Sequence, residues 1–157
     1  MKLRRATQDE IERLRAIADY QFGPGAGGCM IPDNAIVGVS PNTLRIREVY
    51  EAEGRLIATL RANDYLYSLN ILGAEKLKKC FNPPLLRAVV DTSKVKAAKS
   101  IPSIAVLEVD DRLRAGDEVI VVDAEDNLIG VGRLRLSPLE IKARVYGEAI
   151  RLRKRVA

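Results

Sequence analysis

The tetrapeptide Phe-Asn-Pro-Pro at residues 81–84 constrains the fold of this chain more than any other feature. Each proline lacks a backbone N–H donor and restricts the conformation of the residue before it, so no regular helix or strand should cross this point. The break divides the 157 residues into two segments of similar length, each long enough for a small core. We therefore predict two domains, residues 1–84 and 85–157.

The bulk composition predicts a folded protein without a membrane segment. Hydrophobic residues make up 47% of the chain and charged residues 30%, which is typical of a globular domain. No stretch is long and apolar enough to span a bilayer. The basic N-terminus lacks the apolar core of a secretory signal, so we expect a cytoplasmic protein that does not contact a membrane.

Histidine is absent, and the two cysteines, Cys29 and Cys80, are far apart in the sequence. The chain therefore lacks the commonest general base and has too few soft ligands for a zinc site. We expect neither a metal nor another cofactor. For the cysteines, buried free thiols are favoured over a disulfide.

The first segment predicts a helix over residues 8–22, followed by a glycine-rich loop. Thr7 and Glu10 have the spacing of a capping box, and apolar residues recur on one helical face. Gly23 and Pro24 are suited to ending the helix. A phosphate-binding loop would follow a strand and open a helix, whereas here an extended stretch is expected afterwards. We interpret the glycines as a structural joint that lets Tyr20 and Phe22 pack under the next strand; direct contact of the exposed loop amides with a binding partner is the alternative.

The remaining segments predict an α+β protein. Residues 44–61 are expected to form a hairpin that turns at 51–54, and residues 73–80 a short helix. The second half is rich in strands, with a hairpin that turns at 123–127, a short helix after Ser137 and a final strand at 147–156. The fold class is therefore a small α/β N-terminal domain followed by a small, partly closed β-barrel.

Basic residues are concentrated in parts of the second domain. The net charge is +5, which favours a polyanionic partner. Arg133 and Arg135 are spaced by two, as are Arg151, Arg153 and Arg155, so each set should line one face of its strand. If these strands are neighbours they form a basic stripe; the alternative is a solvated face without a ligand.

Two parts of the chain resemble known families. The segment "RLRAIADYQFGPGAGGCMIP", residues 13–32, resembles the start of the C-terminal region of archaeal tRNA-guanine transglycosylase. The segments "LLRAVVD", "RLRAGDEVIVVDAEDNLIGVGRLRLSPLEI" and "GEAIRLRKR" resemble a PUA domain, an RNA-binding module. The resemblance implies a transglycosylase C2-like accessory domain at 1–84 and a PUA domain at 85–157.

What the resemblance implies is binding of tRNA, with the PUA domain on the acceptor stem and the 3′ end. The RNA-binding surface would then comprise the basic segments of the second domain, which are Lys94, Lys96, Lys99, Ser100, Arg133, Arg135, Arg151, Arg153, Lys154 and Arg155. The family usually has glycine where this chain has Ala98, which puts the RNA contact there in doubt.

We expect no catalytic residues, because no pair of a nucleophile and a base stands out and the zinc-containing barrel of a transglycosylase does not fit into this length. The predicted function is a non-catalytic RNA-binding protein that assists tRNA modification in trans, with a separate catalytic subunit as a possible partner. The alternative is a protein-interaction subunit that docks on a modification enzyme or on ribosomal machinery, with RNA binding secondary.

Overall fold

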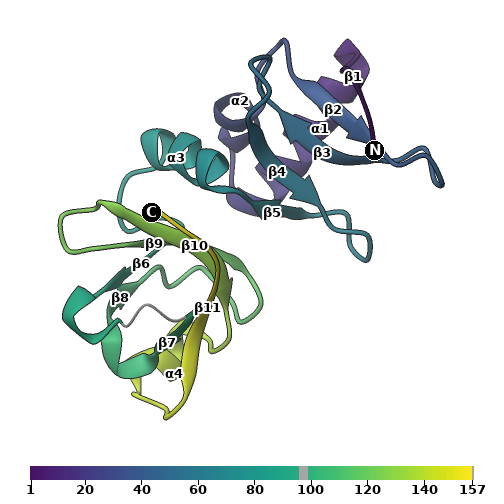
Figure 1. Ribbon diagram of the computed structural model, residues 1–157. Coiled ribbons are helices and arrows are strands. Elements are labelled where there is room, and N and C mark those ends of the chain that lie inside the picture. Colours follow the sequence, from purple (N-terminus) through teal and green to yellow (C-terminus); the bar gives the residue numbers. More distant parts are fainter. Residues whose placement is uncertain (96–98, 157) are drawn as a thin grey trace. The chain divides into compact units, whose positions relative to one another are not determined.

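The computed structural model describes residues 1–95 and 99–156, so the predicted contact at Lys96 and the departure at Ala98 lie outside the described residues. The chain divides into two compact units, Met1–Cys80 (unit 1) and Phe81–Ala157 (unit 2), which are described separately (Figure 1). This division falls just before the boundary expected between residues 84 and 85, which stays a prediction. No helix among the described residues is long and apolar enough to cross a membrane.

Unit 1 begins its helical part with α1 (Gln8–Phe22), as predicted. Both hydrogen bonds of the capping box between Thr7 and Glu10 are present. The helix buries Ile11, Leu14, Ala18 and Phe22. Gly23 ends it with a φ of 120°, a conformation that a side chain would strain.

The glycine-rich segment differs from the prediction, because it forms a short helix, α2 (Ala26–Met30), rather than an extended stretch. Asp19 accepts a hydrogen bond from the Gly27 N–H at 2.7 Å. A Cβ at Gly27 would collide with the backbone of Arg15, so glycine is needed where α2 crosses α1. The segment is a joint between two helices, in agreement with the structural interpretation. Tyr20 is 83% exposed, so its predicted packing under a strand is wrong, whereas Phe22 is buried.

Five antiparallel strands form the sheet of unit 1: β1 (Lys2–Arg5), β2 (Ile36–Val39), β3 (Ile46–Tyr50), β4 (Leu56–Leu60) and β5 (Tyr67–Leu69), adjacent in that order. The hairpin that turns at 51–54 is confirmed, as is the helix before the proline break, α3 (Ile71–Cys80). Buried apolar side chains from the strands and helices form the core, including Leu14, Val49 and Leu60.

A disulfide joins Cys29 in α2 to Cys80 at the end of α3, so the expectation of free thiols is wrong. The two helices pack against each other, which brings the Cα atoms of the cysteines to 6.4 Å. That distance lies within the range that a disulfide spans. The pairing depends on α2, the helix that the sequence pattern did not predict.

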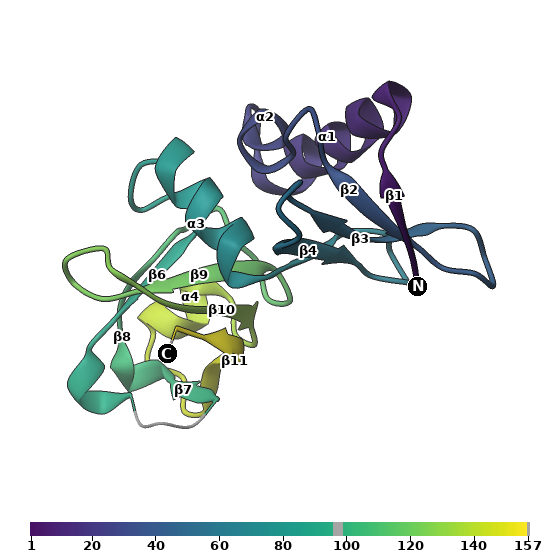
Figure 2. The same cartoon turned by 45° about the horizontal axis from the view of Figure 1, so that its top comes forward.

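Unit 2 is a curled six-stranded sheet of the partly closed type that was predicted (Figure 2). Its strands are β6 (Arg87–Val90), β7 (Ser100–Pro102), β8 (Val106–Val109), β9 (Glu118–Val122), β10 (Leu128–Leu134) and β11 (Glu148–Arg155). They lie in the order β7-β11-β10-β9-β6-β8, and only the β6–β9 pair is parallel.

The described residues of unit 2 also form three short helical segments: the 3₁₀ turns η1 (Thr92–Lys94) and η2 (Ser103–Ala105), and the helix α4 (Pro138–Lys142). The predicted capping box of Ser137 and Glu140 opens α4. The hairpin of β9 and β10, with its turn at 123–127, is also confirmed.

Candidate nucleic-acid interface on unit 2

The strands that carry the predicted basic residues are neighbours, as the basic stripe requires. Arg133 on β10 lies directly opposite Arg151 on β11, and Ser100 on β7 lies on the other side of Arg151. Like charges directly opposite each other across two strands destabilise a sheet. The Arg133–Arg151 pair is therefore not explained by the stability of the fold.

A hollow of about 770 Å³ lies over this part of the sheet. Five of its lining side chains are cationic, and none of the described lining residues is acidic. The lining residues are Lys99, Ala115, Gly116, Arg133, Leu134, Arg135, Arg151, Leu152 and Arg153. We call this hollow the basic groove. Its cations are spaced over a rigid sheet, an arrangement suited to phosphate groups along a nucleic-acid backbone.

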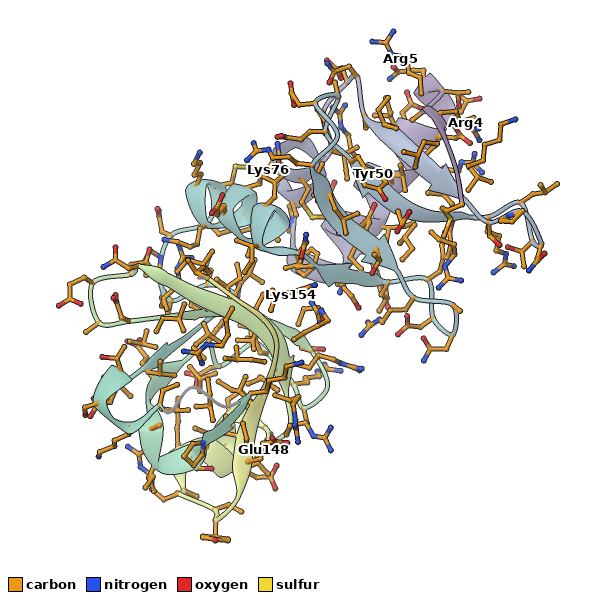
Figure 3. The ribbon with its side chains drawn as sticks, in the orientation of Figure 1. Arg4, Arg5, Tyr50, Lys76, Glu148 and Lys154 are labelled. Carbon is orange, nitrogen blue, oxygen red and sulfur yellow. A yellow bond between two sulfur atoms is a disulfide. The ribbon has the colours of Figure 1, made fainter. Side chains whose placement is uncertain are left out.

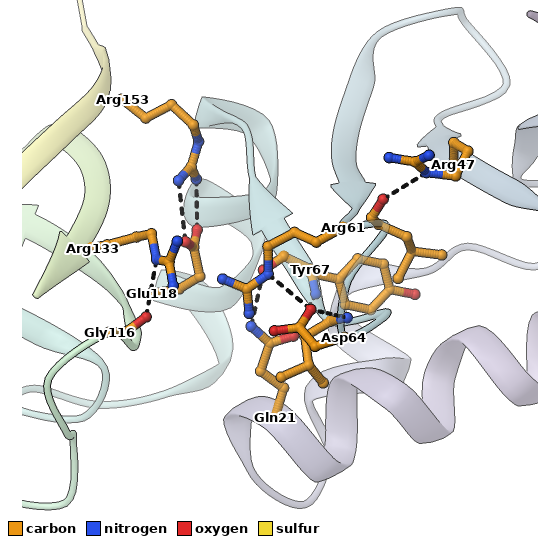
Figure 4. Close-up of polar contacts among 11 residues, drawn as sticks. Gln21, Arg47, Arg61, Asp64, Tyr67, Gly116, Glu118, Arg133 and Arg153 are labelled. Carbon is orange, nitrogen blue, oxygen red and sulfur yellow. Dashed lines mark hydrogen bonds and ion pairs between the residues drawn. The ribbon is translucent and has the colours of Figure 1, made fainter.

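Buried Glu118 fixes Arg153 at one side of the basic groove. The guanidinium donates hydrogen bonds to both carboxylate oxygens, at 3.1 and 2.5 Å (Figure 4). The Glu118 side chain has no exposed surface, so this is a buried ion pair that offsets much of the charge of Arg153. Arg153 therefore shapes the groove more than it adds positive potential.

Arg133 is also held in place, because its Nε donates to the carbonyl oxygen of Gly116 at 3.0 Å (Figure 4). Gly116 has a φ of 93° and turns the chain into β9. The loop before β9 is thus joined to β10 by a side chain of the groove. One nitrogen of Arg133 is engaged in this way while the side chain remains on an exposed face.

Arg135 and Arg151 are exposed cations of the groove. Their side chains are 61% and 55% exposed. Both lie near one carboxylate, that of Glu148, at 3.9 and 3.0 Å. The two exposed guanidinium groups share one carboxylate that is 21% exposed, so one of them can turn to a phosphate while the other keeps Glu148 paired.

The predicted alternation of Arg151, Arg153 and Arg155 is interrupted by a bulge. Residue 152 pairs with Gly132 and residue 154 with Val131, so Arg153 has no directly opposite partner on β10. Beyond the bulge, Lys154 rather than Arg155 takes the strand position equivalent to that of Arg151. Figure 3 labels Lys154 and Glu148 near opposite ends of β11. The expectation that all three arginines line one face is therefore wrong.

The structure separates the predicted contact residues into two groups. Lys99, Arg133, Arg135, Arg151 and Arg153 line the basic groove, and Ser100 lies next to it by its pairing with Arg151. Lys94 on η1, and Lys154 and Arg155 on β11, are exposed but are not among the lining residues. Sequence reasoning missed Gly116 and Glu118. A carboxylate inside the apolar strand "DEVIVV" was a signal that could have indicated a buried ion pair.

No group of three or more His, Cys, Asp or Glu side chains is arranged to hold a metal ion in the described part of the chain. The groove itself contributes cations, backbone and apolar groups, which bind anions rather than metals. Its chemistry is that of an interface for a polyanion.

Comparison with known families agrees with this arrangement. Residues 12–84 match the patch-forming domain C2 of tRNA-guanine transglycosylase, and residues 87–156 match the PUA domain. The chain is 38% identical over 160 residues to the tRNA-guanine(15) transglycosylase of Methanosphaera stadtmanae, with 98% of this chain and 24% of that protein covered. It is 36% identical over 151 residues to that of Methanothermobacter thermautotrophicus, with 94% and 23% covered.

The chain thus spans about a quarter of the length of these curated relatives and corresponds to their C-terminal region. The resemblance found in the sequence is confirmed for both domains.

Two solved structures share the fold over nearly the whole chain. A hypothetical protein from Pyrococcus horikoshii has a TM-score of 0.72 at 16% identity, covering 98% of this chain and 94% of that one. A conserved PUA domain protein from Thermoplasma acidophilum has a TM-score of 0.63 at 17% identity, covering 98% and 93%. At such identity the likeness establishes the fold alone.

Proposed function

We propose that this chain, which joins a C2 domain of the tRNA-guanine transglycosylase type to a PUA domain, binds structured RNA through the basic groove. The RNA that fits the proposal best is tRNA, contacted at its acceptor stem and 3′ end. The chain would supply the RNA-binding part of a tRNA modification system whose catalytic centre lies outside these residues.

The observation that carries the proposal is the Arg133–Arg151 pair inside a groove lined by five cations. Directly opposed arginines repel each other across a sheet; Glu148 pairs with Arg151 in the free protein, and a phosphate between the two arginines would offset the remaining repulsion. Double-stranded RNA is recognised mainly through the shape and phosphates of its A-form helix, which requires cations at fixed spacing rather than base-specific side chains. Arg133, anchored by its hydrogen bond to Gly116, meets this need for a fixed position.

A non-catalytic role agrees with the chemistry of the groove. The lining residues that the structure describes are cationic, apolar or glycine, and they include no nucleophile beside a general base. The groove can therefore hold and orient RNA, while the covalent step would require groups from a separate catalytic subunit or domain.

A second candidate function, docking of a protein partner on unit 2, is favoured by exposed apolar side chains. These are Ile104 on η2, Leu107 on β8, Leu139 on α4, and Val145 and Tyr146 after α4. The helix α4 contacts both η2 and β8, and η2 leads directly into β8, so these side chains belong to one region of the unit. Co-purification from extract before and after nuclease treatment tests this function, because a directly docked protein partner would survive removal of RNA.

The RNA-binding proposal is tested by fluorescence anisotropy with full-length tRNA, an acceptor-stem minihelix and a DNA duplex of equal length. The informative variant is Arg135→Ala/Arg151→Ala, which removes exposed cations without breaking the buried Glu118 pair. We expect tight binding of tRNA and minihelix, and a loss of roughly tenfold or more in the variant. Arg112→Ala is the matched control, since Arg112 is exposed on unit 2 and does not line the groove.

Equal and weak binding of all three nucleic acids would contradict the proposal. So would unchanged tRNA affinity in the Arg135→Ala/Arg151→Ala variant while the Arg112→Ala control also binds normally.

A further inference from the structure

Unit 1 contains two hairpin loops, residues 40–45 and 61–66, that have the same backbone design. They connect β2 to β3 and β4 to β5, and they project from the same end of the sheet (Figure 1). Leu44 donates its N–H to the carbonyl of Ser40 at 2.8 Å, and Tyr65 donates to that of Arg61 at 3.0 Å. In each loop a side chain also accepts a hydrogen bond from the backbone N–H two residues further on. Thr43 accepts from Arg45 at 3.3 Å, and Asp64 accepts from Leu66 at 3.0 Å.

Both loops place a bulky side chain in the left-handed backbone region. Leu44 has a φ of 58° and Tyr65 a φ of 56°. Glycine or asparagine would occupy this region with less strain, and they are the usual residues there. Leu44 is 78% exposed, so its side chain does not compensate the strain by joining the core. Strained backbone of this kind is typical of binding sites, where the side chain itself is needed.

The two loops form walls of one hollow of about 610 Å³, and α1 forms its floor. Its apolar lining comprises Leu14, Ala16, Ile17, Leu44 and Ile46, with Tyr65 as the aromatic member. The guanidinium of Arg45 lies over the Tyr65 ring, 5.8 Å from its centre. A volume of this size is within the range of small-ligand sites. We call it the loop hollow.

The wall that carries Tyr65 is firmly attached to α1. Gln21 accepts the N–H of Tyr67 at 2.7 Å and donates to its carbonyl at 2.9 Å (Figure 4). The Tyr67 hydroxyl donates to the carbonyl of Leu14 at 2.9 Å, and Asp64 accepts from Arg61 Nε at 3.1 Å. The position of Tyr65 is therefore set before any ligand binds, which lowers the cost of binding.

The charges around the loop hollow favour an anionic ligand with a flat ring. Arg13 and Arg45 contribute two cations to the lining. The carboxylate on the rim, Glu10, already accepts two hydrogen bonds from Arg4, at 2.7 and 2.8 Å. An aromatic ring with a stacked guanidinium is a surface on which nucleobases stack, and nearby arginines can contact the attached phosphate.

We propose that the loop hollow binds one unstacked nucleobase of single-stranded RNA, stacked on the Arg45–Tyr65 pair between the two loops. The hollow belongs to unit 1, so this contact is additional to the basic groove. The choice of an RNA nucleotide over a free nucleotide rests on the proposed RNA-binding function. Leu44 forms the opposite apolar wall, and Arg13 is the cation for the sugar–phosphate.

The test uses the full chain and a single-stranded oligouridylate that contains one central 2-aminopurine, whose fluorescence falls when the base stacks. Tyr65→Gly and Leu44→Gly remove the proposed walls and relieve the left-handed strain. We expect quenching with the wild type, affinity at least about fivefold weaker in Tyr65→Gly, and melting temperatures of both variants equal to or above that of the wild type. The second expectation distinguishes a binding role from a structural one.

Two further arms separate this proposal from the groove. The Arg135→Ala/Arg151→Ala variant should retain the quenching, whether or not it still binds the acceptor-stem minihelix. The 2-aminopurine ribonucleoside monophosphate alone should bind more weakly than the oligonucleotide, because it lacks the flanking phosphates.

Absence of quenching with the wild type would overturn the proposal, and would leave a protein side chain as the alternative occupant. Equal quenching in Tyr65→Gly would also overturn it. So would a lower melting temperature in both glycine variants, since the side chains would then serve the fold.

Discussion

The disulfide between Cys29 and Cys80 gives a direct prediction for the stability of unit 1. The two cysteines are 51 positions apart in the sequence, and the disulfide closes the chain between them into a loop. In the chain-entropy description, cross-linking removes about 2.1 + 1.5R ln n cal/mol/K from the unfolded ensemble, which for this loop is about 4 kcal/mol at 25 °C. We therefore expect the Cys29→Ser/Cys80→Ser variant to unfold with a free energy about 4 kcal/mol lower than that of the oxidised wild type.

Guanidinium chloride unfolding followed by tyrosine fluorescence measures this difference. The chain has five tyrosines and no tryptophan, and all but Tyr146 lie in unit 1. The expected change corresponds to a fall of about 1–2 M in the unfolding midpoint. Reductant should move the wild type to the midpoint of the variant and leave the variant unchanged. A midpoint that falls by less than about 0.3 M would refute the reasoning, because the loop would then not be constraining the unfolded chain.

Two more predictions concern unit 1. The guanidinium of Arg4 holds the pKa of Glu10 at about 2, below its ordinary 4.5, so the pair stabilises the fold above about pH 4.5 and this contribution is lost as the pH falls towards 2. Arg4→Ala should therefore lower the stability at neutral pH and flatten its dependence on pH in that window, as measured by tyrosine fluorescence. Parallel acid-unfolding profiles of the variant and the wild type would contradict this. Gly27→Ala should destabilise unit 1 by about 1–3 kcal/mol, because the added methyl group would collide with the backbone of α1. Gly28→Ala should not, because a methyl group there has no atom within 4 Å. Equal unfolding midpoints for the two variants would show that the helix crossing is not tight.

The elements that local signals specify could be predicted from the sequence. The helix at residues 8–22 and the short helix after Ser137 were found through capping boxes, which need only residues three positions apart. The hairpin that turns at 123–127 was found through alternation and turn residues. In each case the chemistry that fixes the element lies within it.

The features that were missed depend on tertiary contacts. The helix α2 has poor intrinsic propensity and is stabilised by packing of Gly27 on α1 and by the hydrogen bond to Asp19. The disulfide requires that α2 and α3 meet, which no local pattern reports. The bulge at Arg153 in β11 depends on its register with β10 and on buried Glu118, so period-two spacing alone could not show it.

The sequence could indicate that the predicted basic residues lie in one region, but not how each of them is held there. The basic residues of β10 and β11 meet in one groove because these strands are neighbours, as the spacing required. The surroundings of the individual arginines differ, which the spacing does not show: Arg153 is ion-paired with the buried carboxylate of Glu118, whereas Arg135 and Arg151 remain exposed. The sequence alone does not distinguish an arginine that shapes a groove from one that binds its ligand.

The salt dependence of binding to the acceptor-stem minihelix tests the central claim most directly. Each phosphate contact contributes about 0.7–0.9 to the slope of log K against log salt concentration. If Arg135 and Arg151 contact phosphates, the Arg135→Ala/Arg151→Ala variant should have a slope shallower than that of the wild type by roughly 1.4–1.8, while Arg112→Ala keeps the wild-type slope. Identical slopes for all three proteins would contradict the assignment of the basic groove as the RNA-binding surface.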